Sequence, residues 1–223
     1  MILYQVVRGL IQVVVKLLWR VSFEGKESVP AEGGFILAPV HRSFIDFGVV
    51  SGVTRRKLRY MGKESLWKSR ALGWFITALG AFPVNRGTAD RESYRRSLDI
   101  LRGGEPLVLF PEGTRRSGPV VEHLSDGAAH MASQAGVPIV PVGIGGSERA
   151  LPKGKRLPRL VKITVVVGPP LAPPPVPEGK SHPSRRAVHE LTLDLQAALQ
   201  DLFDQAQKKA GVPVNAAPPP NVQ

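Results

Sequence analysis

The sequence contains no cysteine among its 223 residues. Disulfide bonds, thiolate-bound zinc and thiol nucleophiles are therefore excluded, and the absence fits a reducing compartment without requiring one. Aromatic residues make up only 6% of the chain, so few rings are available to stack between the bases of single-stranded nucleic acid. The spacing of the histidines predicts no metal site, because they are scattered along the chain. They are His41, His123, His130, His182 and His189.

Acidic residues are scarce relative to basic ones. The chain has 30 Lys and Arg against 18 Asp and Glu, which gives a formal net charge of +12. A basic surface of this size attracts polyanions such as nucleic acid, anionic lipid or phosphorylated substrates. Charge alone therefore permits a non-catalytic membrane binder. No nucleic-acid-binding motif is recognisable, so we expect no nucleic-acid partner.

Residues 1–19 are strongly apolar and carry the basic residues Arg8 and Lys16. No acidic residue precedes Glu24. Within this segment the longest uncharged runs have seven residues, whereas a membrane-spanning helix needs about 20 mostly apolar ones. The segment also lacks the charged start and small-residue cleavage site of a signal peptide. We therefore interpret residues 1–19 as an amphipathic helix at an anionic membrane surface. The alternative is a buried first helix of the core.

Apolar runs alternate with segments of helical periodicity along the rest of the chain. The predicted strands are Arg20–Glu24, Phe35–Pro39, Leu58–Gly62, Phe82–Val84, Leu107–Phe110, Ile139–Ile144 and Val161–Val167. The predicted helices are Tyr4–Trp19, Ile45–Gly52, Lys68–Leu79, Arg91–Leu101, Ala128–Ala135 and Arg185–Lys209. Strands separated by helices predict an α/β fold with a largely parallel sheet of about seven strands, flanked by helices. Ligands of such sheets bind outside the carboxyl ends of the strands.

The composition changes after residue 168. Residues 169–183 are rich in proline and predict an extended connector. A C-terminal helix over 184–209 follows, and its apolar face is expected to pack on the domain. Residues 210–223 are expected to be a disordered tail.

Two polar segments follow predicted strands at the edge where ligands bind. His41 and Asp46 lie five residues apart, just after the strand Phe35–Pro39. At this spacing the carboxylate can accept the Nδ1 proton of the imidazole and leave Nε2 free as a base. The segment Phe110–Arg115, with the sequence FPEGTR, follows another apolar run. One His–Asp spacing arises easily by chance, but a second polar segment at a matching strand exit favours a functional site.

Together with two further segments, these motifs resemble those of the glycerolipid acyltransferases, and most of all the 1-acylglycerol-3-phosphate acyltransferases. The further segments are Gly80–Arg86 (GAFPVNR) and Val137–Val142 (VPIVPV). All four stand in the family's order, within roughly residues 20 to 170, which makes the signal far more specific than a single motif. The resemblance assigns residues 20–168 to an acyltransferase domain. The chain departs from the family where Ser125 and Asp126 precede Gly127, because members often carry a lysine pair there. That turn therefore gives no support for a phosphate contact.

The resemblance implies transfer of a fatty acyl group to the sn-2 hydroxyl of lysophosphatidic acid, giving phosphatidic acid in phospholipid biosynthesis. The donor would be a thioester, either acyl-CoA or acyl carrier protein, and no cofactor is implied. A thioester needs no protein nucleophile, so the substrate hydroxyl takes the place of the serine in a Ser-His-Asp arrangement. His41 would be the base, oriented by Asp46. The alternatives are another lysophospholipid or glycerol 3-phosphate as acceptor, or a non-catalytic basic membrane protein. The expected location is the cytoplasmic face of the cell membrane, in peripheral or monotopic attachment.

The phosphate of the acceptor calls for cationic side chains. Arg86 and Arg115 each follow a strand, and a planar guanidinium binds phosphate oxygens in pairs. Lys63, after the strand Leu58–Gly62, is a third candidate. The alternative for each of the three is an ordinary salt bridge on a basic protein.

The rest of the FPEGTR segment supplies three further candidates. Glu112 either hydrogen-bonds a glycerol hydroxyl or pairs with a neighbouring arginine. Gly113 is expected to permit a sharp turn or a close approach to the substrate. Thr114 is expected to cap the following turn.

Two further features bear on lipid. Trp67 and Trp74 lie beside basic residues in segments that either line an acyl-chain groove, meet a membrane interface, or pack as ordinary helices. A cluster of basic residues contains no acid and is expected to face lipid headgroups, with a merely solvated loop as the alternative. The cluster consists of Lys153, Lys155, Arg156, Arg159 and Lys162.

Overall fold

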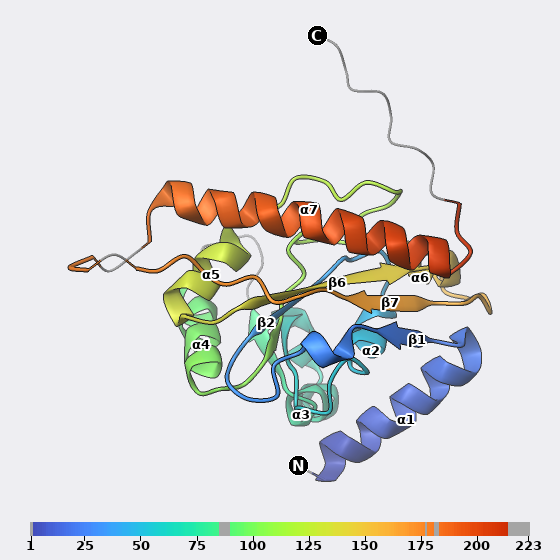
Figure 1. Cartoon of the computed structure of the whole chain (residues 1–223). Coiled ribbons are helices and arrows are strands. Elements are labelled where there is room, and N and C mark those ends of the chain that lie inside the picture. The colour runs from blue at the N-terminus through green and yellow to red at the C-terminus, as the bar shows by residue number, and fades with distance from the viewer. Residues whose placement is uncertain (1, 85–89, 177, 181–182, 214–223) are drawn as a thin grey trace.

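The computed structural model describes residues 2–84, 90–176, 178–180 and 183–213, and these form an α/β fold around a seven-stranded sheet (Figure 1). In sheet order the strands are β1 (Ser22–Glu24), β7 (Thr164–Val167), β6 (Ile139–Gly145), β2 (Ile36–Pro39), β5 (Leu107–Val108), β3 (Arg59–Lys63) and β4 (Ala81–Val84). Neighbouring strands pair in parallel, except for β6 and β7, which are antiparallel. The prediction of a largely parallel sheet of this size is confirmed.

The helices connect these strands and cover the sheet. They are α1 (Ile2–Trp19), α2 (Asp46–Val50), α3 (Arg70–Ala78), α4 (Arg91–Arg102), α5 (Gly127–Ala135), α6 (Ser147–Ala150) and α7 (Arg185–Lys209). Two 3₁₀ turns, η1 (Lys26–Ser28) and η2 (Glu64–Lys68), complete the set within the described residues. Helix α7 lies across one face of the sheet, and α1 and α3 lie on the other side (Figure 1).

Several boundaries differ from the sequence prediction by one to three residues, among them the start of α3 and the end of β5. Helix α3 begins at Arg70 and not at Lys68, because Ser69 is extended and its hydroxyl accepts the backbone N–H of Leu72 as an N-terminal cap. Strand β5 ends at Val108, two residues before the predicted end at Phe110. Beyond it Leu109 still donates its backbone N–H to the carbonyl oxygen of Leu37, and residues 109–111 line a cavity.

Helix α7 packs closely on β6, and two glycines of that strand make this possible. A Cβ atom at Gly143 would lie 2.2 Å from the backbone oxygen of Leu202, and one at Gly145 would lie 2.1 Å from that of Ala206. The predicted apolar stripe of α7 is buried in the same contact. A single long helix thus covers one face of the sheet near the carboxyl end of β6.

Helix α1 is largely exposed. Its buried side chains are Tyr4, Val15 and Trp19, and the indole N–H of Trp19 donates to the carbonyl oxygen of Arg159. Its exposed large apolar side chains are Ile2, Leu3, Val6, Leu10, Val13, Val14, Leu17 and Leu18. In the part of the chain that the structure describes, α1 is the one helix long and apolar enough to cross a membrane.

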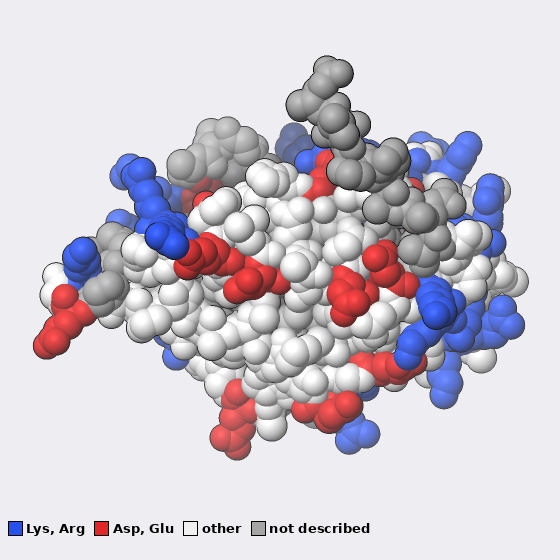
Figure 2. Space-filling model, turned by 45° about the horizontal axis from the view of Figure 1, so that its top comes forward, with Lys and Arg blue, Asp and Glu red and all other residues white. Residues whose placement is uncertain are grey.

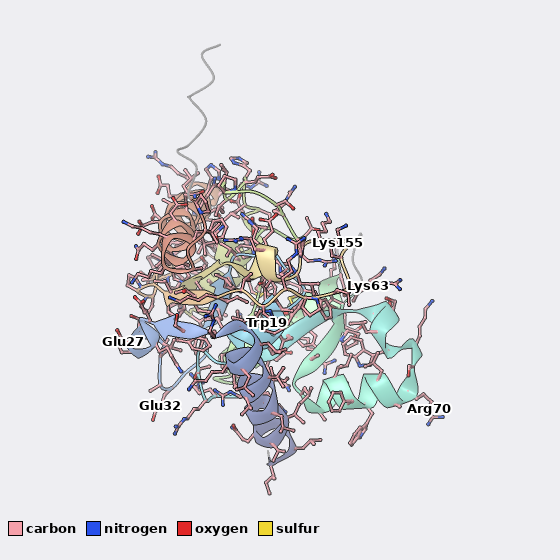
Figure 3. The ribbon with its side chains drawn as sticks, turned by 90° about the vertical axis from the view of Figure 1, so that its right-hand side faces the viewer. Trp19, Glu27, Glu32, Lys63, Arg70 and Lys155 are labelled. Carbon is pink, nitrogen blue, oxygen red and sulfur yellow. The ribbon has the colours of Figure 1, made fainter. Side chains whose placement is uncertain are left out.

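Charge is unevenly distributed over the molecule. Figure 2 shows acidic side chains across the middle of the visible face and basic side chains gathered toward its two ends, with the denser group on the right. That end lies where β6 finishes and α6 begins (Figure 1). Seen from this end, Lys63, Arg70 and Lys155 lie to the right, Trp19 lies near the middle, and Glu27 and Glu32 lie to the left (Figure 3). The excess of positive charge therefore reaches the edge at which ligands of parallel sheets bind.

Candidate active site

The turn after β2 brings the ring of His41 onto Asp46. The Nδ1 atom of His41 lies 3.0 Å from Oδ2 of Asp46, which is fully buried at the first position of α2. The same oxygen accepts the backbone N–H groups of Arg42, at 2.8 Å, and Ser43, at 2.7 Å. Three donors thus fix one carboxylate oxygen, and that oxygen fixes the proton of His41 on Nδ1. Among the described residues, Nε2 of His41 has no hydrogen-bond partner.

Aromatic rings hold the imidazole of His41 from two sides. The ring of Phe110 stacks on it with a centroid distance of 4.0 Å, and the ring of Phe47 meets it edge-on at 5.3 Å. Phe110 also contacts Phe47. Because Phe110 belongs to the FPEGTR segment, this packing brings the two predicted motifs together at one point.

His41 lines a cavity of about 730 Å³ at the carboxyl end of the sheet. Gly113, Thr114 and Arg115 line the same cavity. Its other walls come from α2, β3, β4, α4, β5, α5 and the loops beside them, and the residues include Met61, Tyr94, Val108, Leu109, Ala128 and Met131. Its volume is in the range of small-molecule sites, and its surface combines polar groups near His41 with apolar side chains.

Arg115 presents a cation in this cavity. Within the described part of the chain, no carboxylate pairs with its guanidinium, so the salt-bridge alternative is not observed there. Its neighbour Arg116 instead pairs with Glu122 at 2.9 Å, outside the cavity lining. Arg115 is thus the basic side chain of the FPEGTR segment that remains available to an anionic ligand.

Of the two other predicted phosphate contacts, the structure describes Lys63 and does not describe Arg86. Lys63 lies at the exposed end of β3 and does not line it. Arg86 falls outside the described residues, so its phosphate contact stays a prediction. Ser125 lines the cavity, but Asp126 has its carboxylate 3.4 Å from Nδ1 of His189 on α7.

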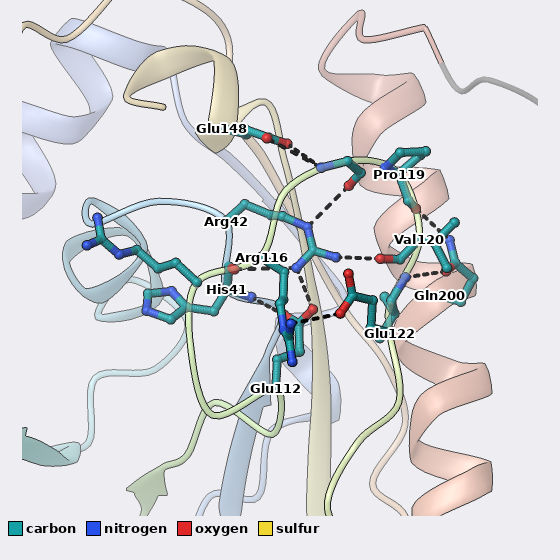
Figure 4. Close-up of polar contacts among 12 residues, drawn as sticks. His41, Arg42, Glu112, Arg116, Pro119, Val120, Glu122, Glu148 and Gln200 are labelled. Atoms are coloured by element: carbon teal, nitrogen blue, oxygen red, sulfur yellow. Dashed lines mark hydrogen bonds and ion pairs between the residues drawn. The ribbon is translucent and has the colours of Figure 1, made fainter. Parts of the chain in front are cut away.

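Glu112 is buried behind the cavity and does not line it. Its Oε1 atom pairs with Nη1 of Arg42 at 2.5 Å, and its Oε2 accepts the backbone N–H of His41 at 2.7 Å (Figure 4). Of the two roles considered for Glu112, the structure shows the pairing with an arginine. Sequence reasoning missed Arg42 as the partner. The available signal was its place inside a loop that directly follows a buried strand.

The far wall of the cavity carries a phenol. The hydroxyl of Tyr94 lies 2.7 Å from Nδ1 of His130, and burial raises the pKa of Tyr94. This wall therefore offers a neutral hydroxyl group. Within the described residues, no three His, Asp or Glu side chains gather in a way that would hold a metal ion.

Comparison with known proteins places the chain in a family. The Acyltransferase family model matches residues 20–145, more than half of the chain. The 1-acyl-sn-glycerol-3-phosphate acyltransferase of Bacillus subtilis is 30% identical over 170 residues, covering 76% of this chain and 82% of that protein. The protein of the same name from Streptococcus pneumoniae is 32% identical over 146 residues, covering 62% and 53%.

A solved structure agrees with the fold. The crystal structure of the 1-acyl-sn-glycerophosphate acyltransferase PlsC from Thermotoga maritima superposes with a TM-score of 0.72 at 24% identity. The match covers 89% of this chain and 79% of that one. The chain therefore belongs to the acyltransferase family, among the PlsC-like glycerolipid acyltransferases.

Proposed function

We propose that this enzyme transfers a fatty acyl group from a thioester to the sn-2 hydroxyl of lysophosphatidic acid and so makes phosphatidic acid. The observation that carries the proposal is the placement of His41, whose ring is held by the buried Asp46, and of Arg115 in the lining of one cavity. The names of the relatives support the same acceptor. Acyl-CoA and acyl carrier protein are both proposed donors.

The chemistry follows from the orientation of His41. With Nδ1 hydrogen-bonded to Asp46, Nε2 takes the proton of the acceptor hydroxyl as its oxygen attacks the thioester carbonyl. The tetrahedral intermediate collapses, the carbon–sulfur bond breaks, and the imidazolium returns the proton to the leaving thiolate. Asp46 stabilises the imidazolium in between. General-base assistance of this kind is worth about 10² to 10⁴ in rate.

The phosphate of lysophosphatidic acid is proposed to bind Arg115, whose guanidinium has no ion pair among the described residues. Gly113 and Thr114 lie beside it in the lining. Arg86 and Lys63 remain proposed contributors, Lys63 with less support because it does not line the cavity. A phosphate held at Arg115 places the glycerol hydroxyls on the side of His41.

The acyl chains are proposed to lie along the apolar part of the cavity, which includes Met61, Leu109 and Met131. Trp67 is less suited to an acyl groove, because its indole packs against Gly73 and donates to the hydroxyl of Thr77. Such satisfied packing is typical of an ordinary helix contact. Trp74 differs, since it is 68% exposed.

The end of the molecule at which the cavity lies, at the carboxyl end of the sheet, is proposed to meet an anionic membrane. Helix α1 exposes a row of large apolar side chains, α3 exposes Trp74, and the loop after α6 exposes Leu157 among basic residues. These elements lie around the carboxyl end of the sheet (Figure 3). Each Lys or Arg near an anionic surface contributes about 1 kcal/mol of attraction. Binding at this face, on the cytoplasmic side, would let a lipid acceptor enter the cavity without crossing water.

A panel of acceptors tests the proposal. Purified protein on anionic vesicles is given acyl-CoA or acylated carrier protein, and released thiol and lipid products are measured. We expect turnover with lysophosphatidic acid and much slower turnover with monoacylglycerol, which has the same glycerol and acyl chain without phosphate. Preference for glycerol 3-phosphate or another lysophospholipid would replace the proposed acceptor. Absence of thiol release with every acceptor and both donors would contradict the enzymatic proposal.

A further inference from the structure

Arg42 is a charged residue that neither the His–Asp spacing nor the FPEGTR segment explains. Its side chain is 1% exposed, and its guanidinium uses all three nitrogens. Nη1 pairs with Glu112, Nη2 donates to the carbonyl oxygen of Val120 at 3.0 Å, and Nε donates to that of Gly118 at 3.3 Å (Figure 4). The guanidinium carbon also lies 4.8 Å from the ring centroid of Phe203 on α7.

The Arg42–Glu112 pair forms hydrogen bonds with the backbone of His41. Oε2 of Glu112 accepts the N–H of His41 at 2.7 Å, and Nη1 of Arg42 lies 3.4 Å from the carbonyl oxygen of His41. The N–H of Arg116 donates to the same carbonyl at 2.9 Å. His41 is thus held through its main chain by the buried pair and through its ring by Asp46.

The loop that surrounds Arg42 is itself tied to α7. The side chain of Gln200 accepts the N–H of Val121 at 2.7 Å and donates to the carbonyl oxygen of Pro119 at 3.0 Å (Figure 4). Because the carbonyl groups of Gly118 and Val120 hold Arg42, the loop, α7 and the His41 turn form one connected network. A planar guanidinium suits this position, since a lysine ammonium lacks the fork that reaches several acceptors at fixed angles.

We propose that Arg42 and Glu112 are positioning residues that set the orientation of the His41 ring toward the cavity. Glu112 acts through His41 and does not contact the acceptor. Both oxygens of Glu112 are already engaged, and neither residue lines the cavity. The inference rests on the proposed role of His41 as the base. A base displaced by about 1 Å from its hydroxyl can lose about 10²-fold in rate.

The test uses the paired substitution, because removing one partner alone leaves a buried charge and can unfold the protein. The Arg42→Met/Glu112→Leu double variant replaces the pair by apolar side chains. It also leaves the N–H of His41 and the carbonyl groups of Gly118 and Val120 without these partners, so its melting temperature is expected to fall, and kcat is measured at a temperature at which the variant is folded. We expect its kcat to fall about 10²-fold, with the KM for lysophosphatidic acid changed by less than about threefold. The single variant Arg42→Lys keeps the charge but lacks the planar fork of the guanidinium. Its kcat is expected to lie between those of the double variant and the wild type.

Two results would overturn the inference. One is a folded double variant with wild-type kcat, which would make the pair purely structural. The other is wild-type kcat with a large rise in acceptor KM, which would mean that Glu112 touches the acceptor. A measurement without substrate separates this from the proposed function. Asp46 is unchanged in the double variant, so ¹⁵N spectra of the imidazole of His41 are expected to show the Nδ1-protonated tautomer in both proteins. The Nδ1 resonance is expected to shift in the double variant, because the displaced ring no longer meets Asp46 at the same distance. Identical spectra would contradict the positioning role even if no acceptor were turned over.

Discussion

Replacement of Asp46 by asparagine removes one charge and almost no volume from the site. Oδ2 of Asp46 accepts three hydrogen bonds, from Nδ1 of His41 and from the backbone N–H groups of Arg42 and Ser43. An amide oxygen has two lone pairs and no charge, so it holds at most two donors well. The two backbone donors are fixed by the turn, so the imidazole is the donor that loses its partner.

The magnitude follows from these contacts. Two charge-assisted hydrogen bonds become neutral, at a cost of about 1 kcal/mol each. Oδ1 has no partner among the described residues, so an amide nitrogen at that place is a buried donor that costs about 1 kcal/mol or more. We expect Asp46→Asn to lose about 3 kcal/mol of unfolding free energy. Its kcat should fall by about 10³ to 10⁴, as in triads whose aspartate is changed to asparagine.

The assay measures thiol release at saturating donor and acceptor, and urea unfolding gives the stability of the same preparation. Asp201→Asn is the matched control, because Asp201 is exposed on α7 and contacts Gln205. It should keep wild-type kcat. If folded Asp46→Asn retained more than about a tenth of the wild-type kcat, where the loss of general-base catalysis alone predicts at least about 10², Asp46 would not orient the base.

Four further outcomes are expected. Arg115→Ala should weaken the binding of lysophosphatidic acid by about 1.5 to 3 kcal/mol, as for a lost charged hydrogen bond. An equal loss with monoacylglycerol would refute the role of Arg115 in binding phosphate. Gly143→Ala should lower the free energy of unfolding by about 3 kcal/mol, since its Cβ would lie 2.2 Å from the backbone oxygen of Leu202; unchanged thermal unfolding would contradict the close packing. Deletion of residues 2–19 should reduce flotation with anionic vesicles, and unchanged partitioning would argue against an interfacial α1. The pKa of Asp126 is lowered, chiefly by a hydrogen bond from Thr192, so its stabilisation is present above its unfolded pKa of about 3.9 and is lost as the pH falls through the lower folded value. Asp126→Asn should therefore be less stable than the wild type at pH 7 and equally stable in strong acid, and a pH-independent difference in urea unfolding would count against this.

The sequence was sufficient for features that depend on local pattern. Alternating apolar runs predicted the strands, and the five-residue spacing predicted that His41 and Asp46 meet, as they do at 3.0 Å. The strand exits also predicted that Arg115 would come near His41, because parallel strands end at one edge. These relations hold within one turn or follow from the sheet as a whole.

Contacts between distant loops were beyond such reasoning. Arg42 and Glu112 are 70 positions apart, and no spacing pattern predicts that two such distant residues form a buried ion pair. From the sequence, Glu112 could equally be a substrate contact. Lys63 likewise ends β3 outside the cavity, and the 3₁₀ turn η2 that follows it was not predicted from the sequence.

The central claim is that the imidazole of His41 removes the proton of the acceptor hydroxyl, and the kcat of His41→Ala tests it most directly. The variant is compared on anionic vesicles with His189→Ala, which removes an exposed histidine whose ring meets Asp126 on the surface. We predict that His41→Ala stays folded and membrane-bound while its kcat falls by about 10² to 10⁴, and that His189→Ala matches the wild type. A folded His41→Ala enzyme within about tenfold of the wild-type kcat, well short of the loss expected for a missing base, would contradict the claim.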